Sequence, residues 1–243
     1  MRVVIAGGHG KIALILERLL SQRGDSVAGF IRNPAQVADL EAAGAQALVV
    51  DLEKASVDDV AAHLHGADAV VFAAGAGPGS GAARKETVDR DAAILLADAA
   101  EAAGVTRYLM ISAMGADIEA VDGARDPAFR DYLRAKDSTS DQDDDGRDPV
   151  FATYLRAKAV ADEAVRARSA LNTTIVRPGL LTNDPGTGRV TIADSTGPGS
   201  IPREDVAAVL AALLDAPETG GQTFEVISGD TPIPDAVASR ARR

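Results

Sequence analysis

Short apolar runs alternate with amphipathic stretches along most of the chain, and this alternation limits the folds that it can adopt. The runs cover residues 2–7, 26–32, 47–52, 69–75, 107–112, 173–179 and 223–228. Their continuous apolar, β-branched character is typical of strands buried on both faces of a parallel sheet. Helical periodicity marks the stretches between them, at residues 11–22, 34–43, 56–64, 84–103, 150–168 and 203–215. The pattern therefore predicts an α/β protein with a doubly wound parallel sheet, the Rossmann fold.

Nothing in the sequence divides the chain, and its composition excludes several classes of protein. No linker or change of composition interrupts the 243 residues, so one domain is expected over residues 1–243. The absence of cysteine leaves no disulfide and no thiolate metal site. A net charge of −11 argues against nucleic-acid binding, and no run reaches the roughly 18 apolar residues of a membrane span. Without a signal-peptide pattern at its start, the chain is expected to be cytoplasmic and not membrane-bound.

One stretch, residues 122–147, departs from the alternation. It holds the first copy of a repeated sequence, DPAFRDYLRAK at 126–136 and DPVFATYLRAK at 148–158, and it ends in an aspartate-rich segment. Clustered Asp and Ser compete with helix formation, so we interpret 122–147 as a duplicated insert that ends in a surface loop. The final glutamate of an EF-hand is missing from this segment. His63 and His65, two residues apart, do not share a helix face, so no metal site is expected.

A glycine-rich turn follows the first predicted strand. In GGHGKIA, at residues 7–13, Gly7, Gly10 and Ala13 have the spacing of a phosphate-binding turn. The first glycine allows the tight turn, the second lets the backbone approach a pyrophosphate, and the alanine allows close packing of helix on strand. Free N–H groups at the start of the helix attract an anion. The turn therefore predicts a dinucleotide site that also includes Gly8, His9, Lys11 and Ile12, although an ordinary strand–helix turn has a similar pattern.

The ends of the next strands predict which dinucleotide is bound. Arg32 ends the second strand, where an NAD site usually has an acidic residue for the ribose 2′-hydroxyl. A guanidinium suits a 2′-phosphate, so NADP is favoured over NAD unless Arg32 is only a solvated charge. The third strand ends in Asp51 and Leu52, where the adenine would lie. After the fourth strand, Ala74 and Gly75 leave backbone without bulky side chains to border the cofactor.

The repeated sequence places a tyrosine four residues before a lysine, as Tyr132 with Lys136 and as Tyr154 with Lys158. On a helix the two side chains face the same way. Tyrosine is a poor acid–base catalyst at neutral pH, and a neighbouring ammonium lowers its pKa. The lysine can also hold a ribose, so such a pair predicts proton transfer beside the cofactor. The alternative is an ordinary surface pair.

Together these motifs resemble the short-chain dehydrogenase/reductase superfamily, and more narrowly its atypical branch, which is NmrA-like or epimerase/dehydratase-like. The resemblance covers essentially the whole chain, through residues 7–13, 88–117, 154–165, 174–182 and 201–214. It implies that Ser112 hydrogen-bonds the substrate oxygen, that Tyr154 gives or takes the proton, and that Lys158 binds the ribose. Asp89 stands where many relatives have an asparagine of the proton relay. Pro178 and Gly179 would lie beside the nicotinamide.

Spacing and context disagree on which tyrosine acts. Tyr132 lies 20 residues after Ser112, close to the spacing of compact relatives, whereas Tyr154 lies 42 residues after it. The residues after Lys136 cannot extend a helix, whereas those after Lys158 continue as an amphipathic helix into the sixth strand. A rigid helix is needed to hold both groups near the cofactor. Tyr154 and Lys158 are therefore the predicted catalytic pair.

The sequence leads us to expect an NADP-dependent oxidoreductase of a small carbonyl or alcohol substrate, and the same residues would serve an epimerase or dehydratase. The alternative is a non-catalytic NADP-sensing module that acts by binding a partner. Asp89 favours that alternative, whereas Ser112, Tyr154 and Lys158 favour an enzyme. Residues 180–243 would add a small cap on the substrate side, which favours a compact substrate over a nucleotide-sugar. No oligomeric state is predicted.

Overall fold

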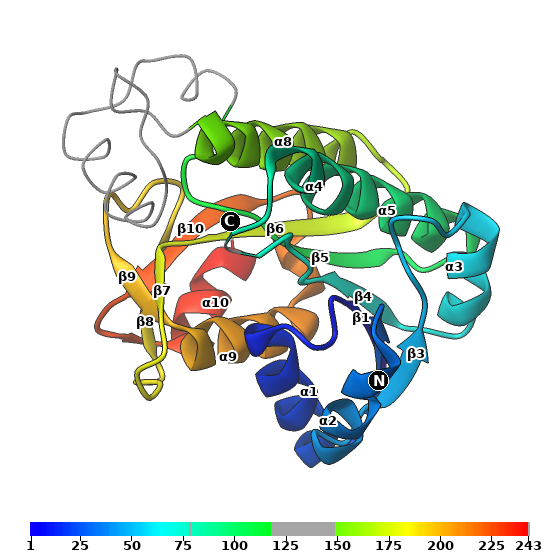
Figure 1. The fold of residues 1–243 in the computed structure, drawn as a ribbon. Coiled ribbons are helices and arrows are strands. Elements are labelled where there is room, and N and C mark those ends of the chain that lie inside the picture. Colours follow the sequence, from blue (N-terminus) through cyan, green and yellow to red (C-terminus); the bar gives the residue numbers. More distant parts are fainter. Residues whose placement is uncertain (78, 118–148, 243) are drawn as a thin grey trace.

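The fold is known from a computed structural model, which describes residues 1–77, 79–117 and 149–242. The predicted insert at 122–147, with Tyr132 and Lys136, lies outside the described residues. Helices cover both faces of a central sheet (Figure 1). Over the described ranges, no helix is long and apolar enough to cross a membrane.

Among the described residues, the central sheet has nine strands in the order β11-β8-β10-β6-β5-β4-β1-β2-β3. The seven strands from β10 to β3 are parallel. Beyond β10, β8 pairs antiparallel with β10, and the edge strand β11 pairs antiparallel with β8. The order β3-β2-β1-β4-β5-β6 is that of a doubly wound sheet, so the predicted fold class is confirmed. The strands are β1 Arg2–Ala6, β2 Ser26–Ile31, β3 Gln46–Val49, β4 Ala69–Phe72, β5 Arg107–Ile111, β6 Asn172–Pro178, β8 Arg189–Ala193, β10 Thr223–Ser228 and β11 Thr231–Pro232.

Helices on the two faces follow the predicted stretches closely. One face carries α1, α2, α9 and α10, and the other carries α3, α4, α5 and α8 (Figure 1). Their bounds are α1 Lys11–Arg23, α2 Val37–Ala42, α3 Val57–Leu64, α4 Ala82–Arg84, α5 Ala92–Ala102, α8 Pro149–Arg166, α9 Arg203–Leu214 and α10 Ile233–Ala241. Short 3₁₀ turns occupy Pro34–Gln36 and Pro217–Thr219. A π-helical segment, Lys85–Asp91, joins α4 to α5.

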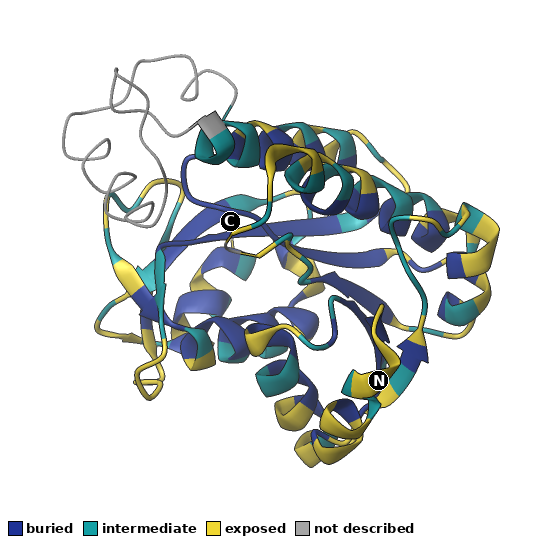
Figure 2. Cartoon of the chain, viewed as in Figure 1, coloured by how far each residue is buried: buried dark blue, intermediate teal, exposed yellow. Residues whose placement is uncertain are grey.

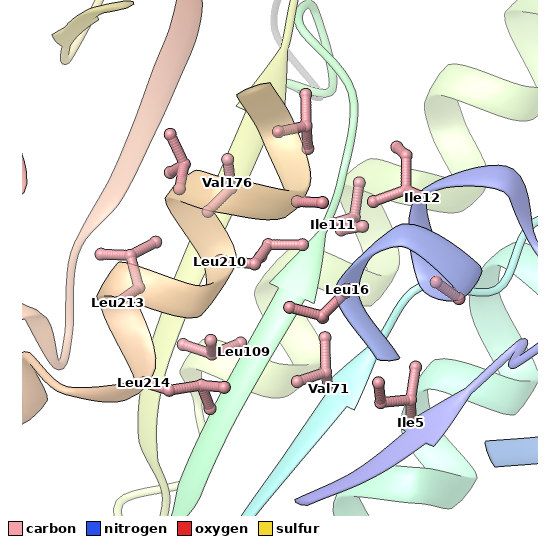
Figure 3. Packing of buried hydrophobic residues seen from close by; sticks show 14 of the residues in the cluster. Ile5, Ile12, Leu16, Val71, Leu109, Ile111, Val176, Leu210, Leu213 and Leu214 are labelled. Atoms are coloured by element: carbon pink, nitrogen blue, oxygen red, sulfur yellow. The ribbon is translucent and has the colours of Figure 1, made fainter. Parts of the chain in front are cut away.

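The core lies in two layers, one on each face of the sheet. Alternate residues of each strand point to opposite faces, so Ile5, Val71 and Leu109 pack against Leu16 of α1 and Leu210 of α9 on one side (Figure 3). The central strands β1, β4, β5 and β6 are almost entirely buried (Figure 2). Each fully buried side chain of this size stabilises the fold by about 1.5–3 kcal/mol. This rigid sheet positions the loops at the carboxyl ends of its strands.

The structure departs from the sequence prediction mainly in its last quarter. Residues 180–243 contain β8, β11 and α10, which were not predicted, and a separate two-stranded sheet of β7 Leu180–Thr182 and β9 Ser200–Pro202. These strands are short and lack the continuous apolar runs that mark the parallel strands. Through β8, β10 and β11, this segment extends the central sheet beyond β6.

Candidate nucleotide and catalytic site

The glycine-rich turn between β1 and α1 has the geometry of a phosphate cradle. Gly7 has a φ of 81°, and a Cβ there would lie 2.6 Å from the Cα of Ala74. The turn thus packs directly on the residues after β4, which only glycine permits. Gly10 precedes α1 and gives no side-chain cap to it. The first N–H groups of α1 therefore have no capping side chain and fit a phosphate group.

A cavity of about 410 Å³ opens in front of this turn. It lies at the carboxyl ends of β1, β2, β3 and β4, where open α/β sheets bind their ligands, and its size suits part of a small organic molecule. Eight of the predicted cofactor residues line it: Gly7, His9, Gly10, Arg32, Asp51, Leu52, Ala74 and Gly75. The sequence thus located eight of the 18 residues that line this cavity.

Six predicted cofactor residues do not line the cavity: Lys158, which is described below, and five others. Gly8 is buried against Gly29 of β2, and the side chain of Ile12 belongs to the hydrophobic core, so only their backbone could face a ligand. Lys11 is exposed at the first position of α1.

Pro178 and Gly179 are buried at the end of β6, where a Cβ on Gly179 would lie 2.3 Å from a backbone oxygen of Gly199. Close packing therefore suffices to explain this glycine.

His9 is held by two side chains from the segment after β2. Its Nε2 lies 2.8 Å from Oδ2 of Asp39, and its Nδ1 lies 2.9 Å from Nε2 of Gln36. If the Gln36 amide donates to Nδ1, then Nε2 carries the proton and donates to Asp39. This orientation fixes the imidazole at the edge of the cavity.

Arg32, the predicted 2′-phosphate ligand, forms an ion pair with an acidic residue that the sequence did not single out. Its Nη1 donates to Oε2 of Glu53 at 2.9 Å. Arg84 of α4 contacts the same oxygen at 3.4 Å, and Thr87 donates to Oε1 at 2.6 Å. Arg32, Glu53 and Arg84 all line the cavity. The rim therefore carries two guanidiniums that share one carboxylate.

Lys158 lies inside the protein at the carboxyl ends of β4 and β5. Only 3% of the residue is exposed, and Nζ lies 3.2 Å from Oδ1 of the fully buried Asp89. Nζ also donates to the backbone oxygens of Ile111 and Ala74, at 3.2 and 3.4 Å. The other oxygen of Asp89 accepts from the N–H of Ala76 at 3.2 Å. The structure thus brings the predicted Lys158 and Asp89 together, next to a wall residue of the cavity.

Tyr154 lies on α8 one turn before Lys158 and is half-buried. The helix is continuous from Pro149 to Arg166, as the pair requires. Nζ of Lys85, from the π-helical segment, lies 5.2 Å from the centre of the Tyr154 ring. The centre of the Phe151 ring lies 5.8 Å from the centre of the Tyr154 ring. A cation from another element, Lys85, therefore lies over the ring of Tyr154.

Ser112 follows β5 and lies over a second buried ion pair. Asp162, one turn after Lys158 on α8, accepts from Nε and Nη2 of Arg177 at 3.0 and 2.8 Å. Burial raises the pKa of Asp162, while Arg177, Ser112 and Lys158 act to lower it. Neither Ser112 Oγ nor Asp162 Oδ1 makes a hydrogen bond of normal geometry within the described part of the chain. The hydroxyl of Ser112 is therefore buried beside a carboxyl with capacity left for another partner.

A third buried carboxyl, Glu17, lies behind the glycine turn. It is fully buried on α1, and neither of its oxygens has a hydrogen-bond partner in the ranges that the structure describes. Burial raises its pKa to about 8. A Cβ on Gly29 would lie 2.5 Å from Oε1 of Glu17, so the two residues fit together closely. At neutral pH Glu17 is mainly uncharged.

The residues that sequence reasoning missed had recognisable signals. Glu17 falls on the apolar face of α1, between Leu16 and Leu20, and Arg177 interrupts the apolar run of β6. A charge inside such a pattern indicates a buried group that is neutral or paired. Glu53 and Arg84 had no local signal, because only the folded chain brings them to Arg32.

Comparison with known proteins places this chain in a family. The family described as NAD(P)H-binding matches residues 7–217. A protein of Bacillus subtilis named as an uncharacterised sugar epimerase is 35% identical over 98% of this chain and 99% of its own length. A solved structure from Bacillus halodurans, named as an NAD-dependent epimerase/dehydratase, is 36% identical with a TM-score of 0.79, over 98% of this chain and 99% of that one.

The fold is shared more widely. The structure of the oxidoreductase ylbE from Lactococcus lactis has a TM-score of 0.80 over 100% of this chain and 98% of its own, at 24% identity. The chain belongs to the NAD(P)H-binding family, with relatives of the epimerase/dehydratase kind. The predicted resemblance is thereby confirmed, and so is the expectation of an NAD(P)-dependent enzyme.

Proposed function

We propose that the protein is an NADP-dependent oxidoreductase of a small carbonyl or alcohol substrate, with epimerase or dehydratase chemistry open to the same residues. The observation that carries the proposal is the placement of Lys158. It lies one turn after Tyr154 on α8, and its ammonium contacts the backbone oxygen of Ala74, a wall residue of the nucleotide cavity. A lysine with that position links a nucleotide site to a proton-transfer residue.

The family's nicotinamide cofactor fits the residues at this end of the sheet. The glycine turn and the start of α1 would hold its pyrophosphate, and Arg32 with Arg84 would hold a 2′-phosphate, which favours NADP. When bound, the cofactor supplies or accepts a hydride.

Tyr154 would give or take the proton at the substrate oxygen, with Lys85 and Lys158 both favouring its phenolate form. Ser112 would hydrogen-bond that oxygen.

A substitution of Tyr154 tests the proposal. Tyr154→Phe is expected to lower turnover at least about 100-fold, because general acid–base catalysis contributes that much, while NADPH binding stays near the wild-type value. The measurement is the loss of absorbance at 340 nm with a panel of aldehydes, ketones and quinones. Tyr132→Phe is the matched control and should keep most of the activity. Loss of activity in Tyr132→Phe and its retention in Tyr154→Phe would overturn the assignment.

One observation favours a second candidate, an NADP-sensing module without catalysis. Asp89 and two backbone oxygens surround the ammonium of Lys158, so three acceptors compete with a ribose for its three donors. Tight NADPH binding with no oxidation across the panel would favour this candidate. An enzyme instead requires that the Lys158 contacts rearrange when the nucleotide binds.

A further inference from the structure

The rim of the nucleotide cavity holds three charged groups that belong to three different parts of the chain. Arg32 follows β2, Glu53 lies in the turn after β3, and Arg84 ends α4. Both guanidiniums contact the same oxygen of Glu53, at 2.9 and 3.4 Å. Thr87 holds the other oxygen at 2.6 Å. The carboxylate is thus fixed from both sides.

The two arginines are not equally satisfied. Arg84 reaches Glu53 at the longer distance, and its Nε is buried without a hydrogen-bond partner in the described residues. The side chain of Arg32 is 52% exposed at the mouth of the cavity. Both cations can therefore take a further acceptor. A phosphate dianion has three acceptor oxygens and suits two guanidiniums better than one carboxylate does.

We propose that Arg32, Arg84 and Glu53 act as one selectivity cluster, in which both arginines bind the 2′-phosphate of NADP and Glu53 competes with that phosphate for them. The inference rests on the proposed NADP function and deepens it. With Glu53 ionised, the cluster has a net charge of +1, and without it the charge is +2. A nucleotide with a free 2′-hydroxyl has no phosphate that must compete with Glu53 for the arginines. Its 2′-hydroxyl can donate a hydrogen bond to Glu53. Glu53 therefore narrows the preference for NADP over NAD.

Binding of two small nucleotides tests the cluster without any need for a substrate. Isothermal titration calorimetry compares 2′,5′-ADP with 5′-AMP, which differ only in the 2′-phosphate. We expect Arg84→Met to weaken 2′,5′-ADP binding about tenfold, as Arg32→Met does, because each removes a charged hydrogen-bonding partner. Glu53→Gln should tighten 2′,5′-ADP binding by roughly 3- to 10-fold through removal of a nearby like charge. Binding of 5′-AMP should change less than twofold in Arg84→Met and should not tighten in Glu53→Gln.

Matched variants remove charges elsewhere on the surface. Glu41→Gln on α2 and Arg18→Met on α1 change exposed residues that do not line the cavity, and both should leave the two affinities unchanged. Unchanged 5′-AMP binding in Arg84→Met also shows that the variant is folded. If 2′,5′-ADP binds the wild type but neither Arg84→Met nor Glu53→Gln alters it, the cluster is wrong and the proposed function stands. If the wild type binds neither nucleotide nor NADPH, both proposals fall.

Discussion

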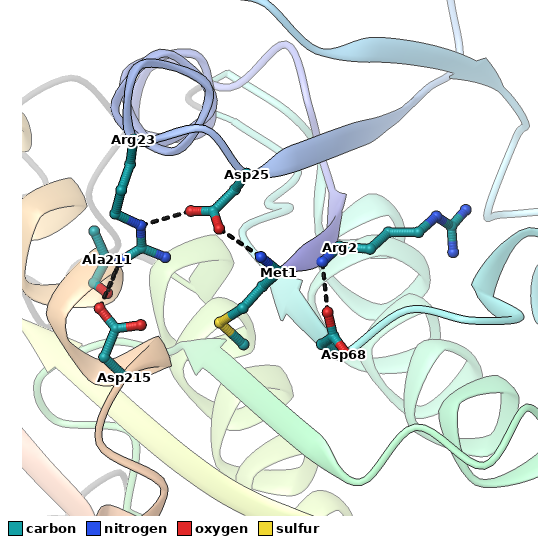
Figure 4. A network of polar contacts seen from close by, with 7 residues as sticks. All are labelled: Met1, Arg2, Arg23, Asp25, Asp68, Ala211 and Asp215. Atoms are coloured by element: carbon teal, nitrogen blue, oxygen red, sulfur yellow. Dashed lines mark hydrogen bonds and ion pairs between the residues drawn. The ribbon is translucent and has the colours of Figure 1, made fainter.

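A cluster of surface ion pairs at the amino ends of the parallel strands contrasts with two buried ion pairs at their carboxyl ends. At the amino ends, ion pairs lie at the surface, where Asp25 pairs with the N-terminal amine and with Arg23, and Arg23 also pairs with Asp215 (Figure 4). At the carboxyl ends, Lys158 with Asp89 and Arg177 with Asp162 are almost completely buried. Solvent screens the surface pairs at the amino ends. Each charge of the buried pairs is shielded from solvent and is stabilised mainly by its partner.

Glu17 sharpens this contrast, because it is buried at the carboxyl ends without a partner in the described part of the chain. Asp89 and Asp162 each face a cation, whereas Glu17 is stabilised by its proton. Burying an ionised carboxylate costs more than protonating it when no cation is near. Of these three buried carboxyls, Asp89 and Asp162 are paired and close to the predicted catalytic residues, whereas Glu17 is neutral and part of the packing behind the glycine turn.

Breaking the buried Arg177–Asp162 pair should have the largest effect on stability. Arg177→Met leaves Asp162 uncompensated in the interior, and we expect a loss of about 3–5 kcal/mol in the free energy of unfolding. Urea denaturation followed by circular dichroism measures it. The double variant Arg177→Met/Asp162→Leu removes both charges and should recover a large part of the loss. A single-variant loss below about 1 kcal/mol would show that the pair behaves like a surface pair.

Replacing the ionisable carboxyl of Glu17 should have an intermediate effect on stability that depends on pH. Its pKa rises from 4.5 to about 8 on folding, so the folded state holds the proton between these values while the unfolded state releases it. Stability from this group is complete below about pH 4.5 and is lost as the pH rises to 8. The wild type should therefore lose stability between pH 4.5 and pH 7.5 that Glu17→Gln does not lose. We expect the free energy of unfolding of Glu17→Gln, relative to that of the wild type, to be about 2–3 kcal/mol higher at pH 7.5 than at pH 4.5.

The comparison between the two pH values isolates ionisation, because the buried amide that Glu17→Gln introduces has the same polar cost at both. Glu163→Gln, an exposed change on α8, is the matched control and should show no such difference. Urea denaturation at pH 4.5, 6 and 7.5 gives the dependence. An equal pH dependence in the wild type and Glu17→Gln would mean that Glu17 is ionised in the folded protein.

Breaking the surface pair at the amino ends should have the smallest effect. Arg23→Ala removes contacts to Asp25 and Asp215, and we expect a loss below about 1 kcal/mol, reduced further in high salt. Urea denaturation at low and high ionic strength measures it. An effect as large as that of Arg177→Met would erase the distinction between the two ends of the sheet.

Much of the fold and part of the site could be predicted from the sequence. The seven apolar runs became the seven parallel strands, because strands buried on both faces need continuous apolar sequence. The glycine turn was located because its backbone conformation demands glycine at residue 7. Strands β8 and β11 were missed, because β8 mixes exposed and buried positions and β11 has only two residues, so neither has a continuous apolar run.

The predicted catalytic residues illustrate the limit. Spacing on α8 was enough to predict that Tyr154 and Lys158 share a helix, and the structure describes that helix as continuous. It was not enough to predict that Asp89 would face Lys158, since the two lie 69 positions apart in the chain. The π-helical segment Lys85–Asp91 brings Asp89 to that place, and no local propensity indicates such a segment.

By itself the sequence determined the doubly wound sheet, the glycine turn and the helical Tyr154–Lys158 pair, because each depends on neighbours within one or two turns or strands. Tertiary structure alone decided which charges meet: Asp89 with Lys158, Asp162 with Arg177, and Glu53 with both Arg32 and Arg84. The physical reason is that local patterns specify backbone conformation and burial. The partner of a buried or shared charge is set by how distant elements pack on the same end of the sheet.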